Sequence, residues 1–362
     1  MRPKGIALLV LALAAGAPAA AGGVLRVFNW SNYIADDTIA AFEAATGIDV
    51  IYTTYDSMEE LELSLLTGVS GADIVVPSSD FLRRAIKNDV FMPLDRDRIP
   101  NWRNLDPGQM AKAAAYDPGN AHAAIYLWGT TGLGYNVDEV RRRLGPDAPV
   151  DSWSLIFDPH YAAKLADCGI TMLDSPVEVL PAVLKYLGLD PAAPGPDDLA
   201  RAEEALDAIR PFVRDFNSAR YIEDLASGSV CLSFGWSGDV FMAAERAEAA
   251  GNGVQIGYAI PKEGAQQWFD MMAIPAEAPN PDAAHAFIDF VLRPEIMAGI
   301  TNYVYFPNAV TASQPYVDEA IRENAEIYPP GEVLDALFPA ALYDAATQRS
   351  LARLWTRMRA GQ

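Results

Sequence analysis

Cysteine and histidine are scarce in this chain of 362 residues, and their scarcity limits the kinds of site it can hold. The two cysteines are Cys168 and Cys231, and the three histidines are His122, His160 and His285. None of them has the spacing of metal ligands, so neither a metal site nor a cofactor is predicted. No histidine has the motif context of a catalytic base, and no catalytic residue is predicted.

Long apolar runs are absent after the first 21 residues. The chain opens with Arg2 and Lys4, an apolar run over residues 6–15 and the small residues 19–21. This order is typical of a secretory signal peptide, and we predict cleavage after Ala21. A membrane anchor is the alternative, but the run is short for a span of roughly 20 residues. The mature chain is therefore predicted to be periplasmic, without membrane insertion.

The predicted export bears on the oxidation state of the two cysteines. In an oxidising compartment an isolated pair favours one disulfide, here Cys168–Cys231. Two buried thiols are the alternative.

Basic residues are outnumbered, with 27 Lys and Arg against 48 Asp and Glu and a formal net charge of −21. Such a surface repels nucleic acid and anionic lipid and attracts small cations, so no nucleic-acid partner is predicted. The length and the 51% hydrophobic content suffice for about two domains with sizeable cores.

Glycine motifs of nucleotide sites and serine hydrolases are incomplete. Residues 127–135 contain neither G-x-G-x-x-G nor a following Lys-Ser/Thr. Residues 68–71 and 235–238 lack the final glycine of G-x-S-x-G. We interpret 127–135 and 254–264 as segments that cross between two lobes.

Strand and helix patterns alternate through the first part of the chain. Residues 25–30, 48–54 and 73–77 are predicted strands, with helices beginning near Asp37 and Ser57. This alternation predicts an α/β fold with a mostly parallel sheet and right-handed crossovers.

The stretch Cys231–Asp239 is the most informative one for function. It reads as a strand that ends near Gly238 and presents Trp236 and Asp239 at its carboxyl end, where α/β sheets place their ligands. An aromatic face beside a carboxylate suits a cation that carries methylene groups. The alternative is that Trp236 is a core residue and Asp239 caps the next helix.

Six motifs occur in an order that resembles one protein family, and the resemblance covers essentially the whole mature chain. They are Asn29–Ile34, Asp73–Ser78, Thr130–Asn136, Pro149–Trp153, Phe234–Asp239 and Ile260–Gly264. Together they resemble the periplasmic polyamine-binding proteins of ABC importers, the putrescine/spermidine type.

The resemblance implies an α/β, two-lobed periplasmic binding protein fold. Each lobe is expected to have a central mixed β-sheet flanked by helices, with the ligand in the interlobe cleft. We predict lobe 1 over residues 22–132 plus 258–305, and lobe 2 over residues 133–257 plus 306–362.

The resemblance also implies a set of ligand-binding residues. Two tryptophans cover the methylenes, two aspartates hold one ammonium, a glutamate serves the far end, and polar or aromatic residues complete the cleft. In that order these are Trp30 and Trp236; Asp239 and Asp270; Glu178; and Ser31, Tyr33, Ser78, Asp80, Trp268 and Phe306.

Each of these residues has a plainer interpretation. Serines and Asp80 can cap helices, Tyr33 can pack on the first helix, Glu178 can be a solvated helix residue, and Trp268 can be core.

Three positions depart from the family pattern, and two of them favour different ligands. Phe306 stands where the family often has Tyr, so one hydroxyl contact is lost. Asp80 stands where diamine binders tend to be small and neutral, whereas Ser175 stands where triamine binders can carry an acid. Both putrescine and spermidine therefore stay candidates.

The predicted function is capture of a polyamine and delivery to an ABC permease with its ATPase, by a monomer that is not an enzyme. Binding of another small solute is the first alternative. An exported hydrolase that uses Asp239 and Asp270 is another, and a sensor that docks on a receptor is a third.

Overall fold

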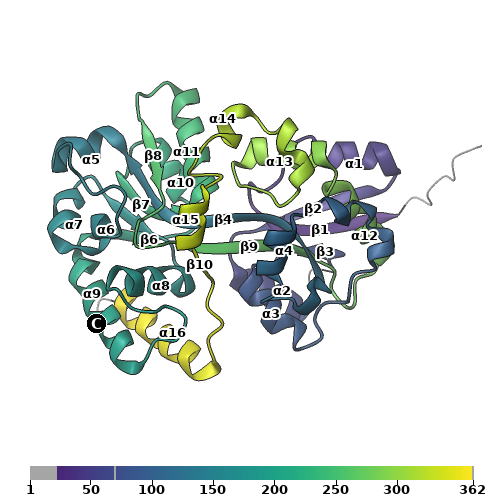
Figure 1. Ribbon diagram of the computed structural model, residues 1–362, viewed down its shortest axis with the longest axis horizontal. Helices are drawn as coiled ribbons and strands as arrows, with labels where there is room; N and C mark the ends of the chain where they lie inside the picture. The colour runs from purple at the N-terminus through teal and green to yellow at the C-terminus, as the bar shows by residue number, and fades with distance from the viewer. Residues whose placement is uncertain (1–22, 69–70, 361–362) are drawn as a thin grey trace, which may run out of the picture.

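The computed structural model describes residues 23–68 and 71–360, so the predicted signal peptide lies outside the described residues. Figure 1 shows two α/β lobes side by side, joined through the long strand β4. The lobe that holds the first strands is called lobe 1, and the lobe that holds the middle of the chain is called lobe 2. Nowhere in the described part of the chain does a helix have the length and apolar character needed to cross a bilayer.

The strands form one hydrogen-bonded path in the order β2-β1-β3-β9-β4-β7-β5-β6, with β10 on β9 and β8 on β4. The strands are β1 (Val24–Trp30), β2 (Asp49–Tyr55), β3 (Ile74–Val75), β4 (Ala123–Asn136), β5 (Ile170–Met172), β6 (Val213–Phe216), β7 (Leu232–Trp236), β8 (Ile256–Ala259), β9 (Gln266–Ala273) and β10 (Phe338–Pro339).

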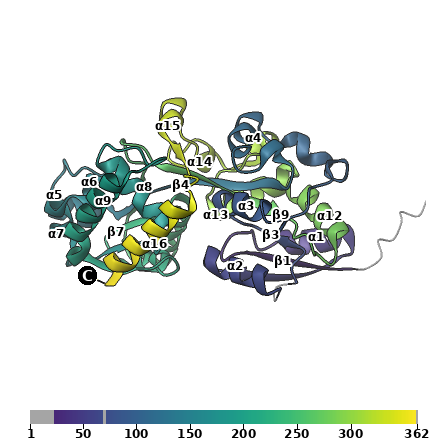
Figure 2. The same cartoon turned by 90° about the horizontal axis from the view of Figure 1, so that it is seen from below.

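Strand β4 belongs to both lobes. Its first half, from Ala123 to Thr130, pairs with β9 in lobe 1. Its second half, from Thr131 to Asn136, pairs with β7 and β8 in lobe 2. The interpretation of residues 127–135 as a segment crossing between lobes is confirmed, and Figures 1 and 2 both show this strand running from one lobe into the other.

The mixed sheet expected in each lobe is confirmed, and the first strands of the chain, from which parallel pairing was predicted, are parallel. Strands β1, β2 and β3 are parallel to one another, as are β5, β6 and β7. Strand β9 is antiparallel to β3 and to β4, and β4 is antiparallel to β7. These antiparallel pairings arise because β4 and β9 connect the lobes instead of completing a local strand–helix–strand unit. The right-handed crossover rule therefore does not fix their direction.

Helices cover the faces of the sheet in both lobes (Figure 1). Those of lobe 1 are α1 (Thr38–Thr46), α2 (Met58–Thr67), α3 (Ser79–Ile86), α4 (Pro107–Ala113), α12 (Pro281–Val291) and α13 (Pro294–Val304). Those of lobe 2 are α5 (Val137–Leu144), α6 (Ser154–Phe157), α7 (Pro159–Leu165), α8 (Pro176–Tyr186), α9 (Pro196–Ile209), α10 (Tyr221–Ala226), α11 (Ser237–Ala250) and α16 (Ala345–Ala360). The short helices α14 (Glu319–Arg322) and α15 (Gly331–Ala336) lie in the segment between α13 and α16.

Local sequence signals account for several helix ends. Gly47 and Gly68 end α1 and α2 with the left-handed backbone that glycine adopts without a steric penalty. Ser57 caps α2, because its side chain accepts a hydrogen bond from the backbone N–H of Glu60.

Each lobe has its own hydrophobic core. The lobe 1 core includes side chains from residues 25–128 and 268–310, and the lobe 2 core includes side chains from residues 133–258 together with Ala265 and α16. The lobe boundaries predicted from the sequence stay a prediction. The core positions of Ala265 and Phe306 favour crossings after each of them, later in the chain than the predicted ones.

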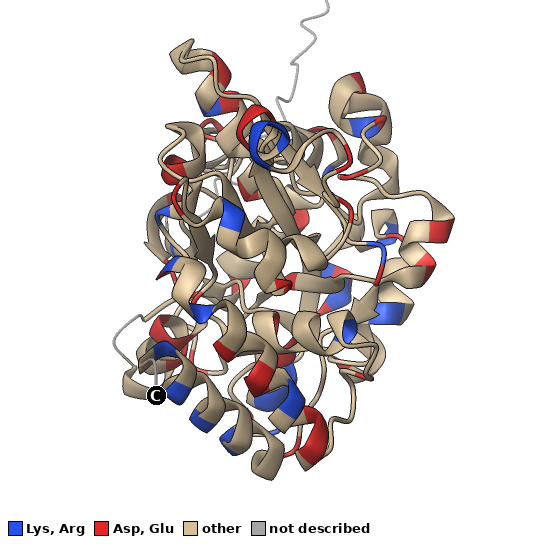
Figure 3. Cartoon of the chain, turned by 90° about the vertical axis from the view of Figure 1, so that its left-hand side faces the viewer, with Lys and Arg blue, Asp and Glu red and all other residues tan. Residues whose placement is uncertain are grey.

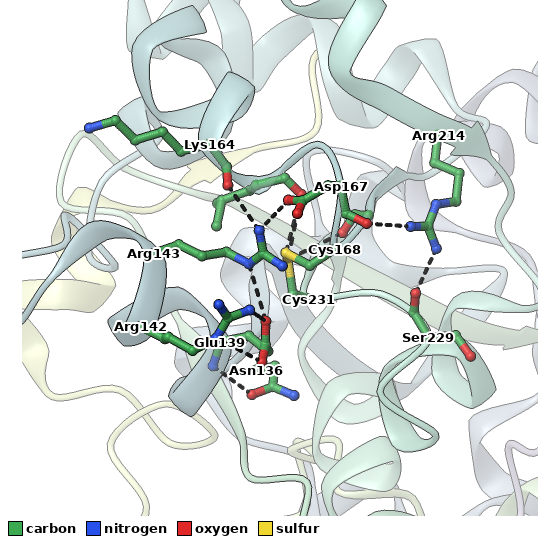
Figure 4. Close-up of a disulfide and its surroundings, with 12 residues drawn as sticks. Asn136, Glu139, Arg142, Arg143, Lys164, Asp167, Cys168, Arg214, Ser229 and Cys231 are labelled. Carbon is green, nitrogen blue, oxygen red and sulfur yellow. Dashed lines mark hydrogen bonds and ion pairs between the residues drawn. A yellow bond between two sulfur atoms is a disulfide. The ribbon is translucent and has the colours of Figure 1, made fainter.

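The disulfide Cys168–Cys231 is present in lobe 2, with 5.5 Å between the two Cα atoms. It ties the end of α7 to the start of β7, the strand that carries Trp236. Figure 4 shows Arg143 beside it, between Glu139 and Asp167, with which it forms ion pairs. The cross-link therefore fixes the base of the strand whose far end faces the cleft.

Charges on the lobe 2 end of the molecule are mixed. Figure 3 shows acidic and basic residues interspersed there, with basic residues along the helix nearest the C-terminus. Two arginines of that helix, Arg357 and Arg359, form ion pairs with Glu203 and Asp174 of lobe 2.

Candidate functional site

A cavity of about 210 Å³ lies between the lobes. All eleven residues predicted to bind ligand line it, although they come from widely separated parts of the chain. They are Trp30, Ser31, Tyr33, Ser78, Asp80, Glu178, Trp236, Asp239, Trp268, Asp270 and Phe306.

Two tryptophans from opposite lobes meet at this cavity. Trp30 ends β1, and its ring is fixed because Nε1 donates to the carbonyl oxygen of Val76 at 2.9 Å. Trp236 ends β7, and its ring centre lies 6.3 Å from that of Trp30. The rings are inclined at 63°, an edge-to-face arrangement. Both are half-buried, so each keeps a surface that a ligand can cover.

Asp270 is the lobe 1 carboxylate of the cavity. It lies in the middle of β9, is buried, and accepts a hydrogen bond from the Tyr33 hydroxyl at 2.7 Å. Burial raises the pKa of Asp270 to about 8; the Tyr33 hydrogen bond opposes this rise, and the charges of Glu178, Asp80 and Asp239 add to it. In the ligand-free cavity this carboxyl group therefore holds a proton near neutral pH.

Asp239 is the matching carboxylate of lobe 2. It lies in the first turn of α11 and accepts a hydrogen bond from the Tyr221 hydroxyl at 2.7 Å. Burial raises its pKa to about 6, and both the Tyr221 hydrogen bond and the charge of Arg246 lower it. The alternative that Asp239 caps the helix is not what the structure shows, because Trp236 occupies the N-cap position.

Tyr221 was missed by the sequence reasoning. Besides holding Asp239, its hydroxyl oxygen accepts a hydrogen bond from the backbone N–H of Trp236 at 3.1 Å. Gly235 makes room for the ring, since a Cβ atom there would lie 2.5 Å from Tyr221 Cε2. That glycine, inside a strand and next to Trp236, is a signal for close approach of another residue.

Glu178 is a second buried acid from lobe 2. It lies in the first turn of α8 and accepts a hydrogen bond from the Thr131 hydroxyl at 2.6 Å. Burial raises its pKa to about 7, and hydrogen bonds from Thr131, Trp236 and Gln266 lower it. The interpretation of Glu178 as a solvated helix residue is excluded by its burial. Thr131 was also missed; the two neighbouring polar side chains Thr130 and Thr131 in a mostly apolar strand are the available signal.

Asp80 has partners from its own helix. Its carboxylate accepts a hydrogen bond from the Ser78 hydroxyl at 2.8 Å and forms an ion pair with Arg84 at 3.0 Å. Ser78 is the N-cap residue of α3, but no side-chain hydrogen bond caps this helix. Arg84 also lines the cavity and was missed, although the i,i+4 spacing to Asp80 is the spacing of helical ion pairs.

Three aromatic rings pack against one another in the cavity wall. Phe306 contacts Tyr33 and Trp268, with ring centres 5.3 Å apart in each pair. Gly129 admits the Trp268 ring, since a Cβ atom there would lie 2.5 Å from its Cζ2 atom. Trp268 and Phe306 are buried in the lobe 1 core and also border the cavity, so the core and ligand interpretations of these residues are compatible.

The chemistry of this cavity suits cations. Its acidic side chains outnumber its basic ones, and six aromatic rings form part of the remaining walls among small polar and aliphatic side chains. Among residues 23–68 and 71–360, no group of three or more His, Cys, Asp or Glu side chains is arranged to hold a metal ion.

Two α/β lobes with a cavity between them define the class of two-lobed solute-binding proteins. The model of the family "Bacterial extracellular solute-binding protein" matches residues 37–328. The chain belongs to this family.

Individual relatives cover nearly the whole chain. It is 49% identical over 366 residues to the putrescine-binding periplasmic protein SpuD of Pseudomonas aeruginosa strain UCBPP-PA14, with 100% of both chains covered. It is 46% identical to the putrescine-binding periplasmic protein PotF of Escherichia coli K12, covering 99% of this chain and 97% of that one. Among solved structures, a putative spermidine/putrescine ABC transporter protein from Listeria monocytogenes superimposes with a TM-score of 0.82 at 29% identity, covering 94% of this chain and 99% of that one.

Proposed function

We propose that this chain captures a polyamine, putrescine or spermidine, in the periplasm and delivers it to an ABC importer. The observation that carries the proposal is the cavity itself, in which both lobes supply carboxylates and tryptophan rings. A polyamine is a chain of ammonium groups joined by methylenes. Each buried ammonium requires a carboxylate or another strong acceptor, and aromatic faces cover the methylenes and attract the charge. The printed names of SpuD and PotF support the same class of ligand.

Each predicted site residue has a role in this proposal. Asp239 and Asp270 hold one ammonium, Glu178 holds the ammonium at the other end, and Trp30 and Trp236 cover the methylenes between them. The remaining walls consist of Ser31, Tyr33, Ser78, Asp80, Trp268 and Phe306.

Binding favours closure of the lobes, because the ligand contacts both of them. Trp30 and Asp270 belong to lobe 1, whereas Glu178, Trp236 and Asp239 belong to lobe 2. A ligand shifts a conformational equilibrium by its difference in affinity for the two states. A polyamine that is held by carboxylates of both lobes therefore binds the closed form more tightly than the open form.

The transport partners follow from this role. We propose that residues 1–21 are removed on export, and that the mature protein works as a periplasmic monomer that presents its closed form to an ABC permease with its ATPase. The acidic net charge keeps the protein away from anionic lipid and nucleic acid.

A thermal-shift panel followed by calorimetry tests the function. The purified mature protein is screened against putrescine, cadaverine, spermidine, spermine, sugars and amino acids. Stabilisation by di- and triamines only, with no turnover of the amine, supports the proposal. Stabilisation by a sugar or an amino acid instead would replace the ligand class, and hydrolysis of an added glycoside would support the two-carboxylate alternative.

A further inference from the structure

Gln266 is a buried polar residue of the cavity wall that the sequence reasoning did not select. It is the first residue of β9, is 3% exposed, and lines the cavity. Its Oε1 atom is enclosed, and no described residue donates a hydrogen bond to it. Folded proteins rarely leave a buried acceptor without a donor. Because Gln266 lines the cavity, a rotation of its side chain can bring Oε1 to the cavity surface, where a donor of the ligand would pair with it.

One other polar atom of this wall has the same status. Among the described residues that line the cavity, Trp268 Nε1 is also enclosed and without a hydrogen-bond partner. It is a donor, whereas Gln266 Oε1 is an acceptor. A protonated polyamine offers N–H donors and no acceptor, so it can satisfy Gln266 and not Trp268. The chemistry of the ligand thus selects Gln266 as the residue that it contacts.

The backbone of Gln266 is held on both sides. Phe338 of β10 is its register partner, and the next residue, Gln267, is the partner of Thr130 in β4. The residue after Thr130 is Thr131, whose hydroxyl donates to Glu178 at 2.6 Å. Adjacent strands therefore place Gln266 and Glu178 in the same part of the cavity.

The two polar atoms of the Gln266 amide, Nε2 and Oε1, have different surroundings. Hydrogen bonding from Gln266 is among the interactions that stabilise the ionised form of Glu178 and lower its pKa, against the larger effect of burial, which raises it. An amide can donate to a carboxylate only through Nε2, so Oε1 is the atom left for a further partner.

We propose that Gln266 is a ligand-binding residue whose Oε1 accepts a hydrogen bond from the ammonium that Glu178 neutralises. The inference rests on the proposed polyamine function. A primary ammonium carries three N–H donors, and Glu178 and Gln266 take two of them. An end of the ligand without N–H groups leaves Oε1 unpaired, so Gln266 selects for a second amine at this end of the chain.

Calorimetry on matched leucine variants tests this role. Gln266→Leu removes the acceptor while keeping a similar size, and Gln267→Leu makes the same change one residue later. Gln267 is a suitable control because its Oε1 accepts from Lys112 at 3.1 Å and it is not part of the cavity wall. Two ligands are compared: putrescine and n-butylamine, which has the same four carbons and one amine.

The expected result is a loss confined to one variant and one ligand. Gln266→Leu weakens putrescine binding by about tenfold, in keeping with one lost hydrogen bond to a charged group. It leaves butylamine unchanged, since a single ammonium takes the site of Asp239 and Asp270. Gln266→Glu keeps an acceptor oxygen and regains affinity over Gln266→Leu, whereas Gln267→Leu binds both ligands like the unmodified protein.

The opposite results overturn the inference in distinguishable ways. Unchanged putrescine affinity in Gln266→Leu removes Gln266 from the site while the polyamine function stands. Equal losses for putrescine and butylamine, with a lower unfolding temperature of the ligand-free variant, assign Gln266 to structure alone. If the unmodified protein binds no polyamine, the proposed function and this inference both fall.

Discussion

The two lobes present the same chemical pair to the cavity, a carboxylate held by a tyrosine, yet the two pairs are not equivalent. In lobe 1, Tyr33 donates to Asp270 at 2.7 Å, and in lobe 2, Tyr221 donates to Asp239 at the same distance. Burial nevertheless raises the pKa of Asp270 to about 8 and that of Asp239 only to about 6.

The difference comes from the surroundings rather than from the shared hydrogen bond. Asp270 interacts with the charges of Glu178, Asp80 and Asp239, which disfavour its ionised form. Asp239 interacts with Arg246, which favours ionisation. At neutral pH the ligand-free cavity therefore holds a proton on the lobe 1 aspartate and a negative charge on the lobe 2 aspartate.

The lobes also differ in covalent cross-linking, because both cysteines are in lobe 2. Replacing Cys168 and Cys231 together by alanine should destabilise the protein by roughly 4 kcal/mol, since the chain-entropy model gives about this value for a loop of the observed 63 positions. Urea unfolding combined with hydrogen exchange measures the change. The loss of protection should be concentrated in β5, β6 and β7, and β1 and β2 should keep theirs. An equal loss in both lobes would show that the cross-link does not act on lobe 2 alone.

Removing the ionised carboxylate of lobe 2 should have the largest effect on binding. Asp239→Ala should weaken polyamine binding at pH 7 by roughly 2–5 kcal/mol, or about thirtyfold to a few thousandfold, because an ammonium is left without its carboxylate. Asp270→Ala should lose less at this pH, because the ligand must first displace a proton from that carboxyl group. Calorimetry on the two variants measures both affinities, and their ratio tests this difference.

Two further variants separate charge from position. Asp239→Asn keeps the shape of the side chain, so a loss similar to that of Asp239→Ala attributes the effect to charge. Trp236→Ala should weaken binding by less than Asp239→Ala, because it leaves no charge unpaired. An Asp239→Ala protein with unchanged affinity would remove Asp239 from the site.

The affinity for a polyamine should depend on pH, because the two aspartates differ in pKa. Binding a cation requires ionised carboxylates, so the complex releases protons wherever the ligand-free pKa lies above the working pH. Affinity should rise at least about tenfold from pH 6 to pH 8, because each coupled proton contributes up to roughly tenfold per pH unit. Most of this rise in affinity should disappear in Asp270→Asn. In Asp239→Asn, the portion of the rise that occurs near pH 8 should remain. Calorimetry in buffers of different ionisation enthalpy counts the protons, and an affinity that falls over this range would contradict the assignment.

The stability of the ligand-free protein should change with pH in the opposite direction to the affinity. A folded-state pKa raised above the unfolded one means that the folded protein binds more protons, so stability decreases as pH rises. For these acids the contribution is fully present below about pH 4 and is lost through about 6 for Asp239, 7 for Glu178 and 8 for Asp270. A polyamine should therefore raise the unfolding temperature more at pH 8 than at pH 6.

How much of this site the sequence could predict depends on the range of the interactions involved. The positions of Trp236 and Asp239 follow from local rules, because a strand that breaks at a glycine places the following residues at its carboxyl end. The hydrogen-bond partners of the buried acids cannot be predicted from such local rules. Tyr33 and Asp270 are 237 positions apart, and Glu178 and Thr131 are 47 apart. Such contacts depend on how each lobe packs distant segments of the chain against one another, which periodicity does not encode.

The fold shows the same division. The helices that begin after Ser57 and end at Gly47 and Gly68 were predictable, since capping is a property of a few adjacent residues. The direction of β4 and β9 was not, because it depends on which lobe each end of the strand joins. The eleven site residues were found through ordered motifs that resemble a family, and Tyr221, Thr131, Arg84 and Gln266 lay outside those assigned roles.

The smallest expected effect concerns the choice between a diamine and a triamine. Asp80 forms an ion pair with Arg84, and their side chains are 18% and 42% exposed. If Asp80 serves a third ammonium, spermidine must compete with the Arg84 guanidinium for it. Arg84→Ala should then raise the affinity for spermidine relative to putrescine by up to about fivefold, the range of a partly exposed pair worth roughly 0.2–1 kcal/mol.

Asp80→Ser should change the same ratio in the opposite direction, because it removes the acid and leaves Arg84 free to repel the ligand. Arg84→Lys retains the positive charge and serves as the control, with a ratio close to that of the unmodified protein. Both affinities are measured by calorimetry at one pH and one salt concentration, since partly exposed pairs are screened by salt. A spermidine-to-putrescine ratio that is the same in Asp80→Ser, Arg84→Ala and the unmodified protein would remove Asp80 from the ligand site. Its carboxylate would then serve α3 alone, through Ser78 and Arg84.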